Sequence, residues 1–160
     1  MTQSETSVVE REIRVEAVPE TVFPFFTDPE KIVRWVGVGA TLDPRPGGVF
    51  RLNVMMSYFM EGEYVEVEPY SRVVFTWGYG EPIPADLGPN PLPAGSTTVE
   101  ISLVPEGEGT IVRLTHRVPA DLFDFHVMGW DNYLERLAIA AAGGDPGPDL
   151  MAELAEAENA

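Results

Sequence analysis

The chain has only two histidines, His116 and His126, and both lie among mostly apolar neighbours. His116 belongs to the stretch "IVRLTHRV", which has the period of two that is typical of a half-buried strand. Arg113 and Arg117 fall on one side of that strand and mark it as the solvent side. His116 falls on the other side with aliphatic residues, so the sequence predicts an imidazole that points into the interior.

A second group of rings lies on the predicted C-terminal helix. His126 precedes Trp130 by four residues and Tyr133 by seven, so the three side chains share one side of the helix. Aromatic and thioether side chains of neighbouring strands could complete an apolar pocket with them. The candidate ligand-binding residues are Trp35, Phe50, Met56, Phe75, Trp77, Tyr79, His116, His126, Trp130 and Tyr133. For any single one of them, a place in the plain core is the default interpretation.

Several roles are open for the two histidines. As metal ligands they would need a third ligand, for which Glu63 or Asp124 would have to point inward, and no HxH or HExxH spacing is present. As candidate catalytic residues, His116 and His126 could serve as acid and base towards a carbonyl or hydroxyl. His116 could instead be a polar handle for a ligand, or a core histidine bonded to threonine, tyrosine or backbone.

His116 is expected to stay neutral. Burial disfavours the imidazolium, and no acidic residue lies beside it in sequence to restore the charge. A buried neutral ring needs partners, because an unpaired one costs about 1–3 kcal/mol. Tyr79, Tyr133, an ordered water or the ligand are the partners that the sequence suggests. Trp35 is expected to be partly buried near one end of the same cavity.

Charge and composition exclude several classes of function. The chain has 26 acidic and 10 basic residues and a formal net charge of −16, so nucleic acid and anionic membranes are poor partners. The absence of cysteine excludes disulfides and thiolate chemistry. No phosphate-binding glycine motif or nucleophile elbow is present, so we expect neither a metal nor another cofactor. The N-terminal segment lacks a signal-peptide pattern and no apolar run could span a bilayer, so we expect a cytoplasmic protein.

The elements that position these residues follow from the hydrophobic period. A first strand is predicted at Val8–Ala17, followed by two short helices, one opened by Pro19 and one capped by Asp28. A period of two then continues from about residue 48 to 118 and predicts an antiparallel meander with one apolar face. The residues expected on that face before the last strand are Phe50, Leu52, Val54, Met56, Val65, Val67, Val73, Phe75, Trp77, Tyr79, Val99, Ile101 and Leu103. With Asp121 as N-cap, a helix of about 22 residues is expected to reach Gly143.

This order predicts an α+β fold, in which a curved antiparallel β-sheet wraps around a long C-terminal α-helix, with two short helices after the first strand. Since a curved sheet and a helix cannot touch everywhere, we expect a cavity between them. One domain should span residues 8–143, with weakly ordered tails at 1–7 and 145–160. The proline-rich segment at 80–96 is either a lid over the cavity or a tolerated insertion.

Five stretches resemble a known family. They are "AVPETVFPFFTDPEKIVRW", "RPGGVFRL", "EGEYVEVEPYSRVVFTW", "GTIVRLTH" and "MGWDNYLERL", and they occur in the order seen in homologues of the activator of heat-shock protein 90 ATPase. The resemblance covers residues from Val9 to Leu137. It implies the helix-grip fold of the START/SRPBCC (Bet v 1-like) superfamily and a cavity suited to an apolar ligand.

The residues and the resemblance together predict a bacterial protein that binds a small hydrophobic or aromatic ligand between the sheet and the C-terminal helix. One alternative is a small-molecule enzyme of the cyclase, dehydratase or hydrolase type, with His116 as acid or base. A second alternative is a chaperone-linked interaction module, which is less expected because the additional N-terminal domain of the eukaryotic co-chaperone has no counterpart here. A homodimer is also left open.

Overall fold

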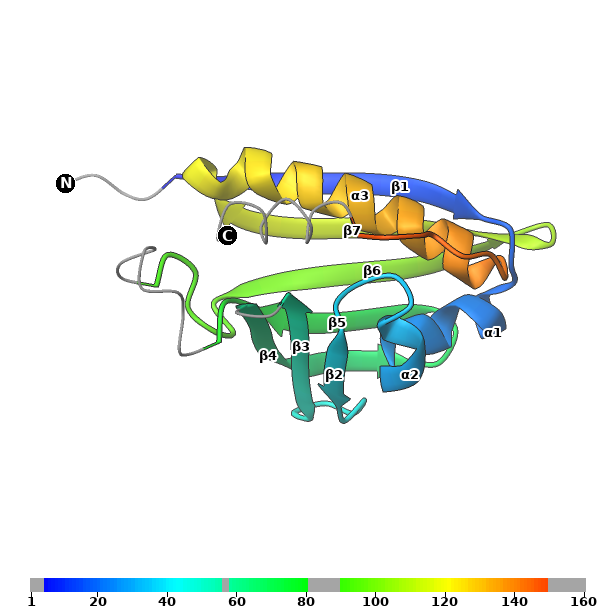
Figure 1. Cartoon of the computed structure of the whole chain (residues 1–160), viewed down its shortest axis with the longest axis horizontal. Coiled ribbons are helices and arrows are strands. Elements are labelled where there is room, and N and C mark those ends of the chain that lie inside the picture. The colour runs from blue at the N-terminus through cyan, green and yellow to red at the C-terminus, as the bar shows by residue number, and fades with distance from the viewer. Residues whose placement is uncertain (1–4, 56–57, 81–89, 150–160) are drawn as a thin grey trace.

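The computed structural model describes residues 5–55, 58–80 and 90–149, which form a seven-stranded sheet with a long helix lying along it (Figure 1). The strands are β1 (Thr6–Val15), β2 (Gly39–Leu42), β3 (Val49–Met55), β4 (Tyr58–Glu68), β5 (Arg72–Trp77), β6 (Thr97–Glu106) and β7 (Gly109–Pro119). The helices are α1 (Pro19–Val22), η1 (Phe23–Phe26), α2 (Pro29–Ile32), η3 (Ala120–Leu122) and α3 (Phe123–Ala141).

The sheet has the order β1-β7-β6-β5-β4-β3-β2, and every neighbouring pair is antiparallel. The chain therefore runs as a meander from β2 to β7, with β1 beside the last strand. α3 packs mainly against β1, while α1, η1 and α2 lie at the end of the sheet where β1 leaves it (Figure 1). The predicted α+β, helix-grip arrangement is confirmed.

Both short helices begin where the sequence predicts. α1 starts at Pro19 and α2 at Pro29, and a proline in the first turn loses no hydrogen bond because its nitrogen would have had no helical partner. Asp28 caps α2, since its carboxylate accepts the backbone N–H of Glu30 at 2.9 Å. These two helices carry the chain from β1 to the opposite edge of the sheet.

α3 starts later than predicted and ends where predicted. Asp121 is not its N-cap, because Ala120–Leu122 form a 3-10 turn between β7 and the helix, and the cap position is Leu122 without a side-chain bond. At the other end Gly143 has φ of +95°, the left-handed conformation that stops a helix. In the described part of the chain, no helix has both the length and the apolar composition needed to cross a membrane.

The sheet differs from the prediction near its short edge. The stretch of residues 47–60, which was predicted as one pattern, belongs to two strands, because Met55 at the end of β3 pairs with Tyr58 at the start of β4 in an antiparallel ladder. β2 was not predicted, since a strand of 4 residues is too short to display a period.

A register shift between Tyr64 and Glu66 changes which side chains of β4 face inward. Tyr64 is fully buried, whereas Val65, which was expected on the apolar face, is 50% exposed. The extra residue of a bulge turns the strand by half a period, so residues before and after it follow different parities. Val67, beyond the bulge, packs against the core as expected.

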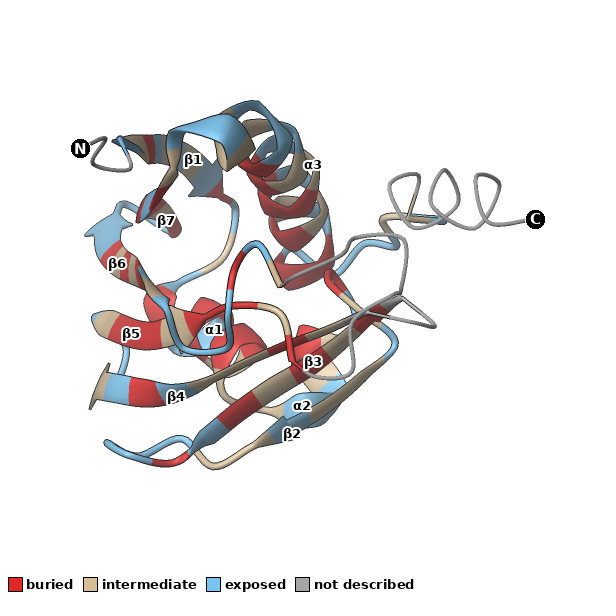
Figure 2. Ribbon diagram, turned by 90° about the vertical axis from the view of Figure 1, so that its left-hand side faces the viewer, coloured by how far each residue is buried: buried red, intermediate tan, exposed pale blue. Residues whose placement is uncertain are grey.

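The inward face of the other strands is buried as predicted (Figure 2). It includes Phe50, Leu52, Val54, Val73, Phe75, Trp77, Val99, Ile101, Leu103, Val112, Leu114, His116 and Val118. α3 turns its buried side towards them (Figure 2). The proposed register of β7 is therefore confirmed, and His116 points inward.

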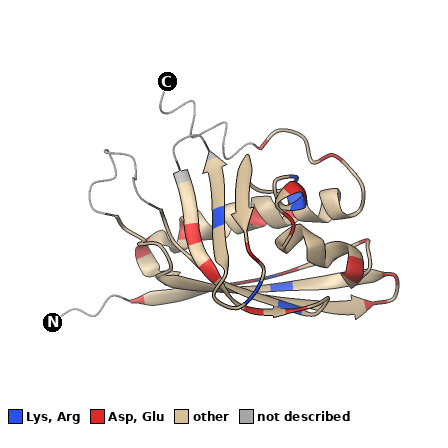
Figure 3. Cartoon of the chain, turned by 90° about the horizontal axis from the view of Figure 1, so that it is seen from below, with Lys and Arg blue, Asp and Glu red and all other residues tan. Residues whose placement is uncertain are grey.

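Charged residues are spread over the strands, the helices and the loops (Figure 3). Some pair across neighbouring strands, as Arg113 does with Glu12 at 2.7 Å and Arg51 with Glu61 at 2.6 Å. Exposed pairs of this kind each contribute little stability, because water competes with them. The acidic excess is mainly a solvated surface.

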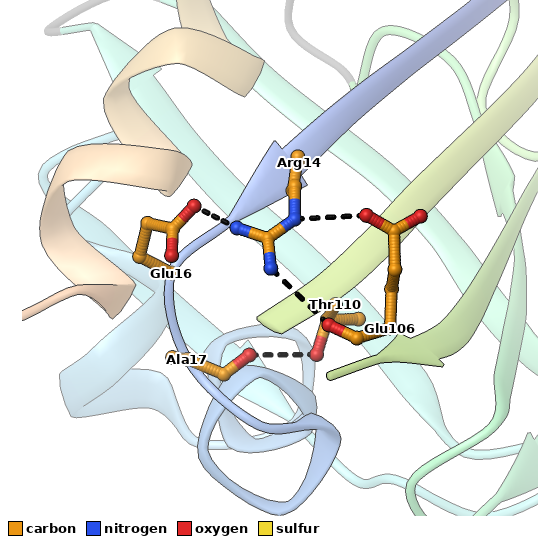
Figure 4. A network of polar contacts seen from close by, with 5 residues as sticks. All are labelled: Arg14, Glu16, Ala17, Glu106 and Thr110. Atoms are coloured by element: carbon orange, nitrogen blue, oxygen red, sulfur yellow. Dashed lines mark hydrogen bonds and ion pairs between the residues drawn. The ribbon is translucent and has the colours of Figure 1, made fainter. Parts of the chain in front are cut away.

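A polar network fixes the end of β1 to the β6–β7 hairpin (Figure 4). The guanidinium of Arg14 bonds to the carboxylates of Glu16 and Glu106, the latter at 3.0 Å, and also to the Glu106 carbonyl at 3.2 Å. The Thr110 hydroxyl donates to the Ala17 carbonyl at 2.7 Å. These contacts set the point at which the chain leaves the sheet for α1.

Candidate functional site

His116 lies in a line of hydrogen bonds whose direction is determined at both ends. The indole N–H of Trp130 donates to His116 Nδ1 at 3.1 Å. His116 Nε2 lies 2.8 Å from the hydroxyl oxygen of Thr97, and that hydroxyl donates to the carbonyl of Trp77 at 2.8 Å. An indole N–H can only donate and a carbonyl can only accept, so the proton of His116 is on Nε2.

This line of bonds makes His116 a neutral and fully paired side chain. It is 0% exposed, and burial, together with the neighbouring His126, lowers its pKa to about 3. Its partners are Thr97 and Trp130 instead of the tyrosines that the sequence suggested. With both ring nitrogens occupied, His116 has no free lone pair for a ligand or for acid–base chemistry.

His126, near the start of α3, keeps one nitrogen available. Its Nδ1 lies 2.9 Å from the carbonyl of Leu122, which places the proton on Nδ1. Burial lowers the pKa of this imidazole, and the bond to Leu122 opposes part of the shift. Nε2 is therefore an unprotonated acceptor, and no described residue bonds to it.

The structure brings six of the predicted residues into one ring series between the sheet and α3: Phe50 on β3, Phe75 and Trp77 on β5, His116 on β7, and His126 and Trp130 on α3. Phe50 stacks on Phe75 with centroids 4.1 Å apart. Trp77 meets Trp130 across the sheet–helix boundary at 5.3 Å. On α3 the series reaches His126, whose ring is 5.2 Å from that of His116. It joins three strands to the helix.

Trp77 is the member of the series whose N–H donor has no acceptor. The residue is 8% exposed, and its indole nitrogen is buried with no partner among the described residues. The other two indoles are satisfied, because Trp35 donates to the carbonyl of Phe25 at 2.9 Å and Trp130 donates to His116. A buried N–H without an acceptor costs about 1–3 kcal/mol.

Trp35 is more fully buried than the partial burial that was predicted, and it belongs to a second ring group beside the short helices. It is 2% exposed and meets Phe26 edge-on at 5.5 Å. Tyr64 connects the two groups, since its ring lies 5.5 Å from Phe50 and its hydroxyl donates to the carbonyl of Phe26 at 2.7 Å. Burial raises the pKa of the Tyr64 hydroxyl. A place for Trp35 at one end of a ligand site stays a prediction.

The two predicted tyrosines contact other parts of the chain. The hydroxyl of Tyr133 donates to Asp149 at 2.8 Å, and burial raises its pKa. Tyr79 is partly buried, and its backbone N–H donates to the carbonyl of Leu92 at 2.6 Å. Asn90 donates its side-chain amide to the carbonyl of Tyr79 at 3.0 Å. Among the described residues, Tyr133 makes no ring contact with the series.

Two predicted features fall outside the described residues, wholly or in part. Met56 is one, and residues 81–89 of the expected lid are the other. The described end of that segment is fixed to the sheet, because Leu92 is 1% exposed and the N–H of Gly95 donates to the carbonyl of Glu61 at 3.0 Å. A lid function for this segment stays a prediction.

The segment after α3, which was expected to begin a weakly ordered tail, folds back along the helix. Arg136 donates through Nη1 to the carbonyls of Gly147 at 2.8 Å and Pro148 at 3.0 Å. Its Nε donates to the carbonyl of Trp35 at 3.0 Å. Residues 150–160 lie outside the described part.

A surface groove of about 710 Å³ lies at the end of the sheet where β1 begins and β7 ends. It is lined by Thr6, Val8, Pro91, Leu92, Pro93, Ser96, Thr97, Thr98, Glu100, Thr115, Arg117, Val118 and Pro119. None of the predicted ligand-binding residues lines it, so it is not the cavity that was expected beneath α3. The groove and the His116 site share one residue, Thr97, which lines the groove and bonds to His116 Nε2.

The acidic residues considered as metal ligands lie elsewhere. Glu63 and Asp124 are both exposed, so neither points towards the histidines. Within residues 5–55, 58–80 and 90–149, no group of three or more His, Cys, Asp or Glu side chains could hold a metal ion.

The sequence matches the family model of Activator of Hsp90 ATPase homolog 1-like proteins over residues 16–142. The chain belongs to this family. The AHSA1-like protein from Rhizobium etli, solved by NMR, is 42% identical and superposes with a TM-score of 0.70 over 93% of this chain and 91% of that chain. The resemblance drawn from the five sequence stretches is therefore confirmed.

Two more distant structures share the fold of this AHSA1-like protein. DynU16, a protein in the dynemicin biosynthetic locus, has 23% identity and a TM-score of 0.71, over 89% of this chain and 50% of that chain. The Aha1 dimer from Colwellia psychrerythraea has 17% identity and a TM-score of 0.69, over 86% of this chain and 98% of that chain. Comparison with curated proteins gives no match.

Thr97 is the residue of this site that sequence reasoning missed. It stands two positions before Val99 on β6, so the period of two places it on the inward face of the strand. The threonine hydroxyl can accept a hydrogen bond from an imidazole and donate one to a carbonyl at the same time. A search for hydroxyls in phase with the buried residues would have found it.

Proposed function

We propose that this AHSA1-like protein binds a small hydrophobic or aromatic molecule against the ring series between the sheet and α3. The observation that carries the proposal is the continuity of the rings from Phe50 on β3 to His126 on α3. Aliphatic side chains would fill a core as well, but ring faces and edges also suit a planar ligand. Ligand pockets are typically lined by hydrophobic and aromatic side chains with a few polar groups among them, which is the composition of this series.

The electrostatics of the series favour an uncharged ligand. Both imidazoles have lowered pKa values and carry no charge at neutral pH. The net charge of −16 repels anions at long range. An apolar molecule therefore meets a lining that is itself neutral.

The relatives add support of a general kind. DynU16 comes from a biosynthetic locus, that of dynemicin, and such a setting suits a small-molecule binder.

The Colwellia psychrerythraea relative is a dimer. A homodimer of the present chain stays a prediction, and sedimentation velocity over a wide concentration range tests it.

Dye displacement and native mass spectrometry test the binding proposal. Wild-type protein should bind an apolar dye such as Nile red and release it to aromatic competitors. Trp130→Ala should weaken dye binding by about tenfold or more, because it removes a large ring from the series. The matched control is Ile139→Ala, which changes a 38% exposed residue of the same helix and should leave binding unchanged.

Ligand contacts in the wild-type protein provide a test that does not depend on a variant. Nuclear Overhauser effects should connect a bound aromatic ligand to the ring protons of Trp130 and His126. If wild-type protein binds no dye, carries no co-purified molecule and shows no such effects, the proposal is wrong.

An enzyme is the second candidate function, and the state of His126 is the observation that favours it. This imidazole is neutral, and its Nε2 is an unprotonated acceptor held in orientation by Leu122, as a general base must be. The acid–base role expected for His116 passes to His126, because His116 has no free nitrogen. Aryl esters and β-hydroxy ketones would test hydrolase and dehydratase activity, and turnover that survives in His126→Gln would exclude this candidate.

A further inference from the structure

Hydrogen bonding singles out Trp77 among the buried side chains of the molecule. The buried polar side chains with a partner include Trp35, Tyr64, Thr110, His116, His126, Trp130 and Tyr133. In the described part of the chain, the indole nitrogen of Trp77 is the one side-chain nitrogen or oxygen that is itself shielded from solvent and makes no hydrogen bond at all. Buried polar groups nearly always have a hydrogen-bond partner, so an unpaired N–H in this core needs an explanation. A ligand that supplies an acceptor would provide one.

None of the described rings around Trp77 has a free acceptor atom for its indole N–H. Phe50 and Phe75, each 6.2 Å away between centroids, have no polar atom. His116 lies 6.2 Å away, but its Nδ1 already accepts from Trp130 and its Nε2 is a donor. Trp130 itself offers only a donor, which is used.

We propose that the ligand carries a neutral hydrogen-bond acceptor, such as a ketone, quinone or ether oxygen, which receives the indole N–H of Trp77. This inference rests on the proposed function and names the chemical class of its ligand. A pure hydrocarbon would leave the N–H unpaired, so it binds less tightly than an oxygen-bearing molecule of the same shape. A carboxylate would bring an uncompensated charge into a lining whose two imidazoles are neutral. Trp77 is thus a specificity-determining residue.

The test compares 9-fluorenone with fluorene, two tricyclic molecules that differ by a carbonyl in place of a methylene group. Wild-type protein should bind fluorenone about five- to tenfold more tightly than fluorene, the difference that one hydrogen bond to a buried donor gives. Trp77→Phe should reduce the affinity for fluorenone to that for fluorene and leave fluorene unchanged. The matched control is Trp35→Phe, in which the lost N–H served the carbonyl of Phe25. It should preserve the preference for the ketone.

The indole resonances of the wild-type protein give a second readout. Fluorenone should move the Trp77 indole proton downfield, fluorene should not, and neither should move the Trp35 indole proton in that way. Equal affinities for the two molecules, a preference that persists in Trp77→Phe, or an unmoved Trp77 indole proton would overturn the inference while leaving apolar binding intact. If neither molecule binds wild-type protein or displaces Nile red, the proposed function fails and the inference fails with it.

Discussion

His116 and His126 carry their protons on different nitrogens although their rings are only 5.2 Å apart. In His116 the donor Trp130 occupies Nδ1 and leaves the proton on Nε2. In His126 the carbonyl of Leu122 draws the proton to Nδ1. The difference comes from the hydrogen-bond partner in each case, and it decides which ring can still do chemistry.

The depressed pKa of His116 makes stability depend on pH. Its pKa falls from 6.5 in the unfolded chain to about 3 in the fold, because burial penalises the charged ring. The stabilisation is present in full above the unfolded pKa and is lost as pH falls from 6.5 towards 3. Lowering the pH from 7 to 5 should therefore reduce the free energy of unfolding by about 2 kcal/mol from this group alone. Urea denaturation at the two pH values measures it.

A His116→Asn variant serves as the comparison for this prediction, and its stability should fall less over the same interval. His126, which faces His116 and also has a lowered pKa, contributes a remainder in the same direction. Long-range ¹H–¹⁵N spectra should show His116 protonated on Nε2 only and His126 on Nδ1 only. An imidazolium pattern for His116 at pH 5 would contradict the account.

At the scale of elements, β4 changes its pairing partner along its length. Its first half pairs with β3 up to Glu63, and its second half pairs with β5 from Tyr64, with a register shift two residues later. The change of partner occurs beside Gly62, where a Cβ atom would lie 2.1 Å from the carbonyl oxygen of Thr76. Only a glycine permits the two strands to approach so closely there.

Two glycine substitutions should therefore have opposite effects on stability. Gly62→Ala should destabilise the protein by roughly 1–3 kcal/mol, because the new methyl group meets backbone that cannot move aside. Gly129→Ala, in the middle of α3, should stabilise it by about 0.5–1 kcal/mol, since a Cβ there meets nothing within 4 Å and alanine favours helix. Chemical denaturation of both variants measures the difference. Similar effects in the two variants would show that the close approach in β4 does not matter.

At the scale of the whole molecule, Arg136 joins parts of the chain that the sheet does not hold together. Its guanidinium donates to the carbonyl of Trp35, just beyond α2, and to the carbonyls of Gly147 and Pro148 in the segment after α3. Asp149 adds a second attachment of that segment at Tyr133. The helix is thus tied at its C-terminal half to both neighbours, while its N-terminal half carries His126 and Trp130.

Arg136→Gln should lower the free energy of unfolding by about 1.5–3 kcal/mol, because four carbonyls, two of them partly buried, lose a charged donor. Amide hydrogen exchange should also accelerate at Asp145, Gly147 and Asp149, the residues of this segment that have a backbone N–H. The matched control is Arg113→Gln, which removes a pair with Glu12 in which the arginine side chain is 61% exposed. Its effect should stay within about 0.5 kcal/mol. Equal losses in the two variants would mean that Arg136 acts only as a surface charge.

The sequence by itself determined which face of each regular strand is buried, because a period of two depends only on the local order of polar and apolar residues. It thereby predicted the inward position of His116, the buried stripe of α3 around Trp130, and the stop of the helix at Gly143. The predictions were wrong where a local irregularity of the backbone interrupted the period of two or the start of the helix. The bulge after Tyr64 leaves Val65 exposed. The 3-10 turn before α3 includes Asp121, so Asp121 does not occupy the N-cap position of the helix.

Only the tertiary structure decided the hydrogen bonds of the site. Thr97 and Trp130 reach His116 from 19 and 14 residues away, and a pattern of neighbours within one element cannot choose between such partners. The same holds for Trp77, whose indole appears in the sequence as one aromatic residue among many. That its N–H lacks an acceptor depends on where the surrounding rings already donate and accept, which is fixed when β5, β7 and α3 pack together.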